Sequence, residues 1–212
     1  MKYIDKQAEP QAFADWKQRP RTYERFKKSA PIKKVVKEAL MKEQGFLCCY
    51  CERRLTDDDS HIEHFKPRKD SSVDALDFSN LLCSCQKDLV PGEPRHCGNA
   101  KGGYDSALLV SPLDETCEAR FAFTGDGFIQ TAKEADAIAR QTIKQLQLDI
   151  PKLRALRRGA IAPFLEGDIS EEDFQAFVKG YLEIADTGAF SEFWTTVRYL
   201  FGGCIDSTQR QR

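Results

Sequence analysis

The sequence predicts a mixed α+β protein that is mostly helical, with a small cysteine-rich core between an N-terminal helical arm and a C-terminal helical bundle. Apolar residues recur at helical spacing on both sides of the centre, and only short segments resemble strands. The central stretch 48–103 holds six of the eight cysteines and all three histidines. This stretch therefore concentrates the side chains that bind metal or move protons.

We divide the chain into three regions that are expected to pack as one unit. Residues 1–45 form the arm and the first long helix, 46–130 the core with a β-hairpin, and 131–212 the C-terminal helical region. A chain of 212 residues is long enough for one large domain, or for a small core with helical flanks.

Composition limits the class of protein. No apolar run approaches the length of about eighteen residues that a membrane span needs, so we expect no membrane partner. The N-terminus lacks the apolar segment of a signal peptide. We therefore expect a cytoplasmic protein with reduced thiols, in which clustered cysteines indicate metal.

Charge is unevenly distributed although the net charge is only −1. The segment 17–37 carries nine Lys/Arg and one acid, 140–158 carries six against one, and 166–186 carries seven acids and one lysine. These runs are either solvated helix faces, or a basic flank for phosphates and an acidic region for a partner.

The arm should be irregular or short-helical, because Pro10 and Pro20 interrupt any long helix. A clear helix follows from Ser29, which can cap it, with Pro31 in its first turn. Gly45 ends this helix where a left-handed residue is favoured.

Past the central stretch, Leu108–Val110 resembles a strand, and the Thr-Gly-Asp-Gly sequence at 124–127 predicts a hairpin. Thr131 and Glu134 have the spacing of a capping box, which predicts a helix from Thr131. Three further helices are expected to start near Asp149, Ser170 and Ser191. The polar tail 207–212 is expected to fray.

Cys48 and Cys51 form a C-x-x-C knuckle, a spacing that brings two thiolates to one tetrahedral ion. Two more ligands must come from Cys83, Cys85 and Cys97, of which we favour the last two. The loop between them is rich in proline and glycine and can return the chain to the ion. The sequence therefore predicts structural zinc.

Alternatives to this ligand set remain open. Cys83 lies in an apolar run that suits a buried thiol, but an extended Cys-Ser-Cys tripeptide points Cys83 and Cys85 the same way, so Cys83 could replace Cys85. His96 is an outside candidate. The remaining cysteines are expected to be idle or in the core: Cys49, Cys117 and Cys204.

Between the two halves of the zinc site lies His61–Arg68, a predicted strand that its proline should end. The adjacent Glu63 and His64 suit phosphodiester hydrolysis, since a carboxylate oxygen can hold Mg²⁺ and a neutral imidazole can accept a proton from water. Asn80 and Asn99 can add an orienting hydrogen bond and a neutral oxygen ligand.

Five motifs follow one another in this stretch: Cys48-x-x-Cys51, Glu63-His64-x-x-Pro67, Asn80-Leu81-Leu82, Cys85, and Cys97-Gly98-Asn99-x-Lys101-Gly102. Their order resembles that of the HNH (ββα-metal) endonuclease family, in the subgroup where cysteine pairs bracket the motif. Within that family the chain is most similar to the HNH nucleases of retron and Septu anti-phage systems, the PtuB type.

The resemblance implies a ββα-metal core that hydrolyses phosphodiester bonds of nucleic acid, DNA in the first place, in anti-phage defence. It implies His64 as general base, Glu63 as a ligand of catalytic Mg²⁺ or Mn²⁺, and Asn80 as the residue that steadies the loop and the base. Asn99 corresponds to a third position, another ligand of the catalytic ion, for which His96 is the other claimant.

The resemblance also implies an ABC/SMC-like ATPase partner of the PtuA type, and it allows a homodimer within a larger complex. The sequence has no G-x-x-x-x-G-K-[ST] loop, so nucleotide sensing is expected from the partner. Lys66, Arg68 and Lys101 are either phosphate ligands or solvated charges, and His61 is expected to be a surface or supporting histidine. The alternative function is a zinc-stabilised nucleic-acid-binding or adaptor module without catalysis.

Overall fold

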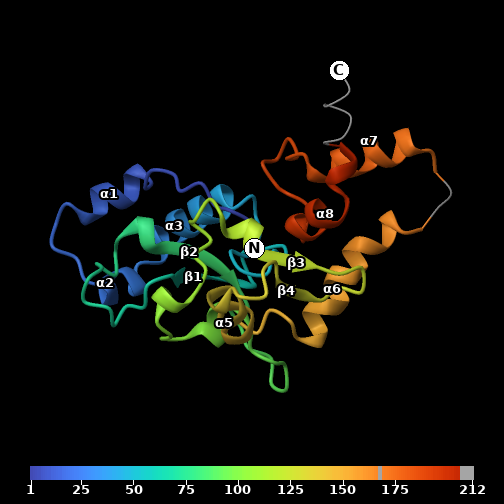
Figure 1. Ribbon diagram of the computed structural model, residues 1–212. Helices are drawn as coiled ribbons and strands as arrows, with labels where there is room; N and C mark the ends of the chain where they lie inside the picture. Colours follow the sequence, from blue (N-terminus) through green and yellow to red (C-terminus); the bar gives the residue numbers. More distant parts are fainter. Residues whose placement is uncertain (167–168, 206–212) are drawn as a thin grey trace.

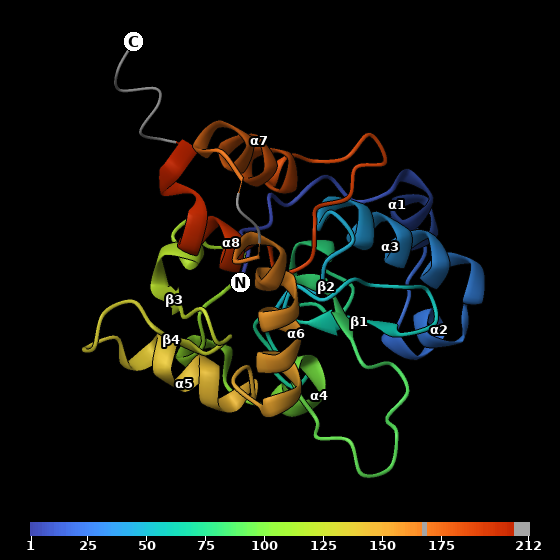
Figure 2. The same ribbon diagram turned by 90° about the vertical axis from the view of Figure 1, so that its right-hand side faces the viewer.

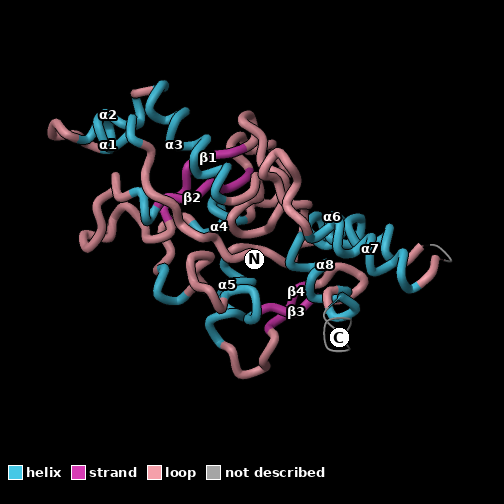
Figure 3. Tube along the Cα trace, turned by 90° about the horizontal axis from the view of Figure 1, so that it is seen from above, coloured by secondary structure: helices cyan, strands magenta, loops and turns pink. Residues whose placement is uncertain are grey.

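The structure of the protein is a computed structural model that describes residues 1–166 and 169–205. The predicted mixed α+β class is confirmed: helices predominate, and the strands form two antiparallel two-stranded sheets. The arm helices lie at one end of the molecule and the last three helices at the other, with the first sheet between them (Figures 1 and 3).

The first half of the chain contains three helices, two strands and a short helix: α1 (Gln11–Lys17), α2 (Tyr23–Lys28), α3 (Ala30–Glu43), β1 (Ser60–His64), β2 (Leu81–Cys85) and α4 (Cys97–Lys101). The described part of the second half contains two strands and four helices: β3 (Phe121–Phe123), β4 (Ile129–Thr131), α5 (Ala137–Gln145), α6 (Pro151–Ile161), α7 (Glu171–Leu182) and α8 (Trp194–Phe201). Short 3₁₀ turns cover Phe78–Asn80, Ser106–Leu108, Cys117–Arg120 and Ala162–Phe164.

Helix α3 lies where the sequence predicts it, with Pro31 in its first turn. The predicted side-chain cap is wrong, because the Ser29 hydroxyl makes no capping hydrogen bond. Ser29 also ends α2, where its N–H donates to the Phe26 carbonyl. Gly45 is left-handed (φ +59°), and a Cβ there would lie 2.2 Å from the Phe190 ring. Glycine is therefore required both for the turn and for the approach of the C-terminal region.

Strands β1 and β2 form an antiparallel pair in which Glu63 faces Leu82 and His64 faces Leu81. β1 ends at His64, three residues before the proline that predicted its end. Every residue of β2 is buried, between α3 on one side and α4 on the other. The loop 86–96, which joins β2 to α4, projects from the molecule (Figure 2).

The predicted hairpin is confirmed, with Phe121 opposite Thr131. Because Thr131 is part of that strand, the predicted capping box is wrong, and Asp136 caps α5 instead by accepting from the Ala139 N–H at 2.9 Å. The strand predicted at Leu108–Val110 is also wrong. The Val110 N–H donates to the Thr142 hydroxyl at 2.8 Å, so a side chain replaces a strand partner.

The three later helices start close to their predicted positions. Pro151 opens α6, and Ser170 caps α7 through the Asp173 N–H. α8 begins at Trp194 after the left-handed Phe193. The predicted tail 207–212 lies outside the described residues.

Buried apolar side chains form one large cluster from the arm through α6 and a smaller one between α7 and α8. Polar contacts tie the knuckle to the C-terminal region: Glu52 accepts from the Thr195 N–H at 2.8 Å, and the Arg54 N–H donates to Glu192 at 2.7 Å. In the part of the chain that the structure describes, no helix combines the length and the apolar character that a membrane crossing requires.

Candidate functional site

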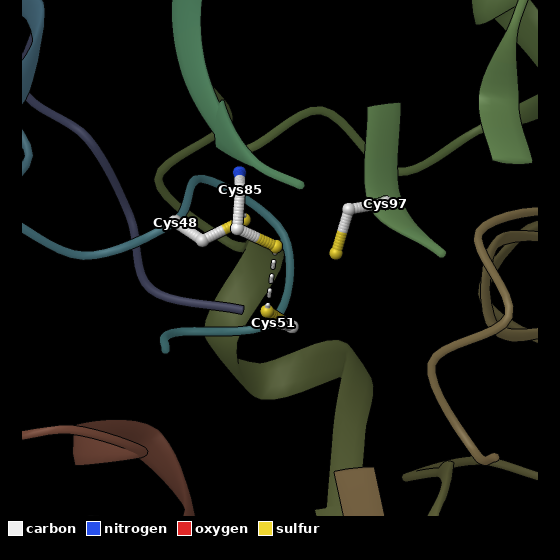
Figure 4. Close-up of side chains that lie close together, drawn as sticks. All are labelled: Cys48, Cys51, Cys85 and Cys97. Atoms are coloured by element: carbon white, nitrogen blue, oxygen red, sulfur yellow. Dashed lines mark hydrogen bonds between the residues drawn. The ribbon is translucent and has the colours of Figure 1, made fainter. Parts of the chain in front are cut away.

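Four buried cysteines from three separate segments meet in the interior (Figure 4). Cys48 and Cys51 come from the turn after α3, Cys85 from the end of β2 and Cys97 from the start of α4. Their sulfur atoms all lie within 4.8 Å of one another. The Cys51 and Cys85 sulfurs are 3.7 Å apart, close to the edge of about 3.8 Å expected for tetrahedral zinc.

Local backbone geometry brings the first two thiols together. The Cys48 N–H donates to the Arg53 carbonyl at 2.8 Å, and the Glu52 N–H donates to the Cys48 carbonyl at 3.1 Å. Glu52 is left-handed (φ +65°), which reverses the chain after Cys51. The Cys85 backbone nitrogen lies 3.4 Å from the Cys48 sulfur, so the end of β2 also directs an N–H donor toward the four cysteine sulfurs.

The chemistry of these thiols fits a soft cation. Burial and hydrogen bonds with Cys48 and Cys51 raise the pKa of the Cys97 thiol, and hydrogen bonds with the same two residues raise that of Cys85. Four buried thiolates repel one another unless a cation neutralises them. A closed set of four cysteines matches the donors that structural zinc uses, so these residues could bind zinc.

The other cysteines lie outside this group. Cys83 is buried, and burial raises its pKa to about 12, as it does for Cys117. Cys49 is likewise buried, whereas Cys204 is partly exposed rather than a core thiol. The structure therefore places Cys85, and not Cys83, with the other three.

His96 lies beside the cysteines. Its Nδ1 atom is 3.1 Å from the Cys97 sulfur and 3.8 Å from the Cys85 sulfur, and its Nε2 atom is buried without a partner. It does not line the pocket described next, whereas Asn99 does.

A pocket of about 510 Å³ opens beside the end of β1 and α4. Its lining brings together three of the residues singled out from the sequence: Glu63, His64 and Asn99. Because β1 ends at His64, the two neighbouring side chains reach one pocket although they alternate along the strand.

Glu63 is held by a buried cation. Its Oε1 atom lies 2.8 Å from the Lys101 ammonium and accepts a hydrogen bond from the Tyr50 hydroxyl at 3.2 Å. Its Oε2 atom lies 3.8 Å from Nε2 of His61. Burial opposes ionisation, but His61 and Lys101 together lower the pKa of Glu63, so the carboxylate is charged at neutral pH.

Lys101 is only 3% exposed, so its interpretation as a solvated charge is wrong. Its ammonium also donates to the His64 carbonyl at 2.8 Å and so braces the end of β1. The pairing with Glu63 spans 38 positions of the chain, and the sequence carried no local signal for it or for Tyr50.

Gly98 permits the close packing of α4 on β1. A Cβ at this position would lie 2.7 Å from Oε2 of Glu63 and 2.9 Å from Nε2 of His61. These two donor atoms therefore face the same space at the start of α4.

The His64 ring is oriented by the backbone. Its Nε2 atom lies 2.9 Å from the Ala75 carbonyl oxygen, which can only accept, so Nε2 carries the proton and Nδ1 of the neutral ring is left as a base. The Tyr23 ring packs edge-on at 5.3 Å. Burial lowers the pKa of His64, which keeps the ring neutral at physiological pH.

Asn80 does not line the pocket. Its side-chain oxygen accepts from the Lys66 N–H at 2.7 Å, and its amide donates to the Lys66 carbonyl at 2.9 Å. Asn80 thereby fixes the chain directly after His64.

Asn99 is held at the pocket wall, where its amide donates to the Gln86 carbonyl at 2.6 Å. The pocket lining thus includes three groups that can serve as ligands of a divalent ion: the Glu63 carboxylate, the Asn99 side-chain oxygen and the ring of His61, which the sequence suggested only as a supporting histidine. Mg²⁺ commonly takes one or two carboxylates and completes its shell with water and phosphate, so this donor set fits such an ion when substrate is present.

Comparison with known proteins finds relatives over part of the chain. No protein-family model matches the chain. The chain is 31% identical over 138 residues to "Retron Vc95 putative HNH endonuclease" of Vibrio cholerae serotype O1 biovar El Tor, covering 61% of this chain and 65% of that protein. It is 34% identical over 133 residues to "Retron Ec83 putative HNH endonuclease" of Escherichia coli, covering 55% of this chain and 52% of that protein. The chain thus spans slightly less than two thirds of one relative and about half of the other.

Proposed function

We propose that this chain, which is similar to two putative HNH endonucleases of retrons, is a metal-dependent endonuclease that hydrolyses phosphodiester bonds. The observation that carries the proposal is the pocket in which Glu63 and His64 meet at the end of β1. The order β1–β2–α4 supports its interpretation as a ββα-metal core.

His64 acts as the general base in this proposal. The Ala75 carbonyl holds the Nε2 proton, so Nδ1 accepts the proton of the attacking water. Asn80 fixes the backbone after His64, and Lys101 holds its carbonyl, so the ring is aimed before substrate arrives. Such preorganisation avoids the cost of ordering the base during the reaction.

Two different metal ions are proposed. Zinc, held by Cys48, Cys51, Cys85 and Cys97, fixes the strand ends and α4 relative to each other. Glu63, His61 and Asn99 would hold Mg²⁺ or Mn²⁺, which when bound would neutralise negative charge that develops on the phosphate. Lys101 leaves one Glu63 oxygen available for this role.

We also propose DNA as the substrate and anti-phage defence as the setting. Both rest on the resemblance to retron and Septu nucleases, as does an ABC/SMC-like ATPase as partner. Co-expression with such an ATPase, followed by co-purification and cleavage of DNA and RNA, tests these points together. Failure of the two chains to co-purify would remove the partner from the proposal.

A nicking assay tests the catalytic proposal directly. Supercoiled plasmid is incubated with the protein in Mg²⁺ or Mn²⁺, and in parallel with EDTA. We expect nicked and linear products only with the divalent ion. Binding of nucleic acid without any cleavage would favour the alternative, a zinc-stabilised binding or adaptor module.

The decisive variant is His64→Ala. Loss of a general base typically lowers the rate about 10²- to 10⁴-fold, so we expect the nicking rate to fall by that factor. Zinc content and melting temperature should stay close to those of the unsubstituted protein. Ser72→Ala, at an exposed position of the loop after β1, is the matched control and should keep full activity. Full activity in His64→Ala would refute the mechanism.

A further inference from the structure

A second cavity, also of about 510 Å³, lies between the arm helices and β1. Five lysines line it: Lys27, Lys33, Lys34, Lys37 and Lys87. The lining includes a single carboxylate, that of Asp57, which is 2.6 Å from the Lys37 ammonium. We call this cavity the lysine groove.

The lysine groove continues into the pocket of Glu63 and His64. Tyr23, His61 and Ile62 line both cavities. Tyr23 lies at this junction with its ring against His64 on one side and the Arg68 guanidinium 4.4 Å from its ring centre. A chain-like ligand in the groove would therefore pass directly to the candidate base.

The groove lysines are placed to meet a row of negative charges. Lys33 and Lys37 are one helical turn apart on α3, about 6 Å along its axis, and Lys27 is in the last turn of α2. Lys34 has only a weak surface pair with Glu38 at 3.8 Å. Among the described residues, no ion pair is seen for Lys27, Lys33 or Lys87.

This concentration of charge stands out in a protein whose net charge is only −1. Lysines that face a cavity without counter-charges attract a polyanion, and phosphate contacts supply most of the affinity for nucleic acid that is independent of sequence. Partly exposed aromatic rings such as Tyr23 can in addition stack with a base.

We propose that the lysine groove binds the sugar–phosphate backbone of one strand of nucleic acid and leads it past Tyr23 to His64. The inference rests on the proposed endonuclease function and extends it by assigning the substrate path to the N-terminal arm. The ligand is recognised by its phosphates rather than by its base sequence.

The test is a binding measurement in the catalytically disabled His64→Ala protein. The probes are a labelled 30-nucleotide single-stranded DNA, the corresponding duplex and an RNA of the same sequence, each titrated at several salt concentrations. The groove variant is Lys27→Gln/Lys33→Gln/Lys34→Gln. The control variant, Lys42→Gln/Lys133→Gln/Lys179→Gln, removes three exposed lysines that do not line either cavity.

The control matches the groove variant closely. Each removes three exposed charges. All three groove lysines and two of the three control lysines lie on helices, and Lys179 pairs with Glu183 at 3.8 Å just as Lys34 pairs with Glu38. Any difference between the two variants therefore reports position and not net charge.

We expect the groove variant to bind its best probe about tenfold more weakly and to lower the slope of log K against log salt by about 2, since each lost phosphate contact removes about 0.7–0.9. The control variant should bind the same probe within about twofold of the affinity of the His64→Ala protein. Preference for single-stranded or duplex probe then identifies the form of the substrate.

Equal binding by the groove and control variants, or no measurable binding of any probe at low salt, would overturn the inference. The nicking assay separates this failure from failure of the proposed function. If the protein nicks plasmid but binds equally well without the groove lysines, the proposed function stands and the proposed substrate path is wrong. If the protein needs these lysines for binding but does not cleave, the proposed substrate path stands and the proposed catalytic role is wrong.

Discussion

The cysteine cluster and the Glu63 pocket lie on the same strands and helix, yet they differ in what they offer a cation. The cluster supplies four soft ligands, all buried and all from the chain. The pocket supplies one carboxylate, and Lys101 already neutralises one of its oxygens. It is also open to solvent and continuous with the lysine groove.

In the proposed function, this difference assigns two metals with different purposes to one short motif. A complete, dry set of thiolates binds its ion whether or not substrate is present, and therefore stabilises the fold. An incomplete, open set of oxygen and nitrogen donors needs substrate oxygens to complete the shell. The first three predictions below each test one side of this contrast, and the last compares the buried ion pair of the pocket with a more exposed one.

The largest effect is expected from Cys51→Ser. Structural zinc contributes about 10 kcal/mol or more to the folding of small zinc domains. We expect the variant to lose stoichiometric zinc, measured by elemental analysis, and to melt about 10 °C lower or more.

Cys117→Ser is the matched control for this change, because its thiol is also buried but lies outside the cluster. It should keep zinc and lose only a small part of its stability. Equal zinc content in the two variants would contradict the assignment of the cluster as the zinc site.

A second prediction concerns the buried Lys101–Glu63 pair, whose side chains are 1% and 10% exposed. Glu63→Gln leaves a buried ammonium without a counter-charge, which costs about 3–5 kcal/mol in comparable pairs. Glu63→Gln/Lys101→Met should recover most of this loss, as measured by urea unfolding. If the double variant is as unstable as the single one, the Glu63 carboxylate does not compensate the charge of the buried Lys101 ammonium.

Gly98→Ala should separate catalysis from zinc binding. The added Cβ would meet Oε2 of Glu63 at 2.7 Å and displace it, and misplacement of a catalytic group by about 1 Å can cost about 10²-fold in rate. We expect such a loss in the nicking assay with zinc content retained. The control is Gly180→Ala in α7, where nothing lies within 4 Å of the new Cβ and full activity is expected. Undiminished nicking by Gly98→Ala would argue against tight packing at Glu63.

The smallest effect is expected at the more exposed Arg120–Asp136 pair, which contrasts with the buried pair of the pocket. The hydrogen bond from Arg120, 2.8 Å long, lowers the pKa of Asp136 to about 2. A carboxyl whose folded pKa lies below its unfolded value of about 3.9 adds stability above that pH and loses it as the pH falls toward 2.

We therefore expect Asp136→Asn, which keeps the helix cap, to lose about 1 kcal/mol at pH 7, since the arginine side chain is 25% exposed and partly screened. The difference in the free energy of unfolding between the variant and the unsubstituted protein, measured by chemical unfolding, should shrink as the pH falls from 4 to 2. A difference that does not vary with pH would mean that the ion pair contributes nothing.

Several elements could be predicted because their signals are local. Pro151 and Ser170 marked helix starts, and the Thr-Gly-Asp-Gly turn marked a hairpin. The errors arose where a distant group competed with a local signal. Thr131 pairs with Phe121 rather than capping a helix, and Val110 bonds the Thr142 side chain rather than a strand.

The side chains available to a metal and to a base could be named from the sequence alone, because the C-x-x-C spacing and the Glu63-His64 dipeptide are local patterns of a few residues. Long-range packing brought Cys85, and not Cys83, into the cluster, set Lys101 and Tyr50 against Glu63, and placed the arm lysines along the lysine groove. These arrangements depend on burial and on contacts between distant segments, and no local pattern encodes the energy of such contacts.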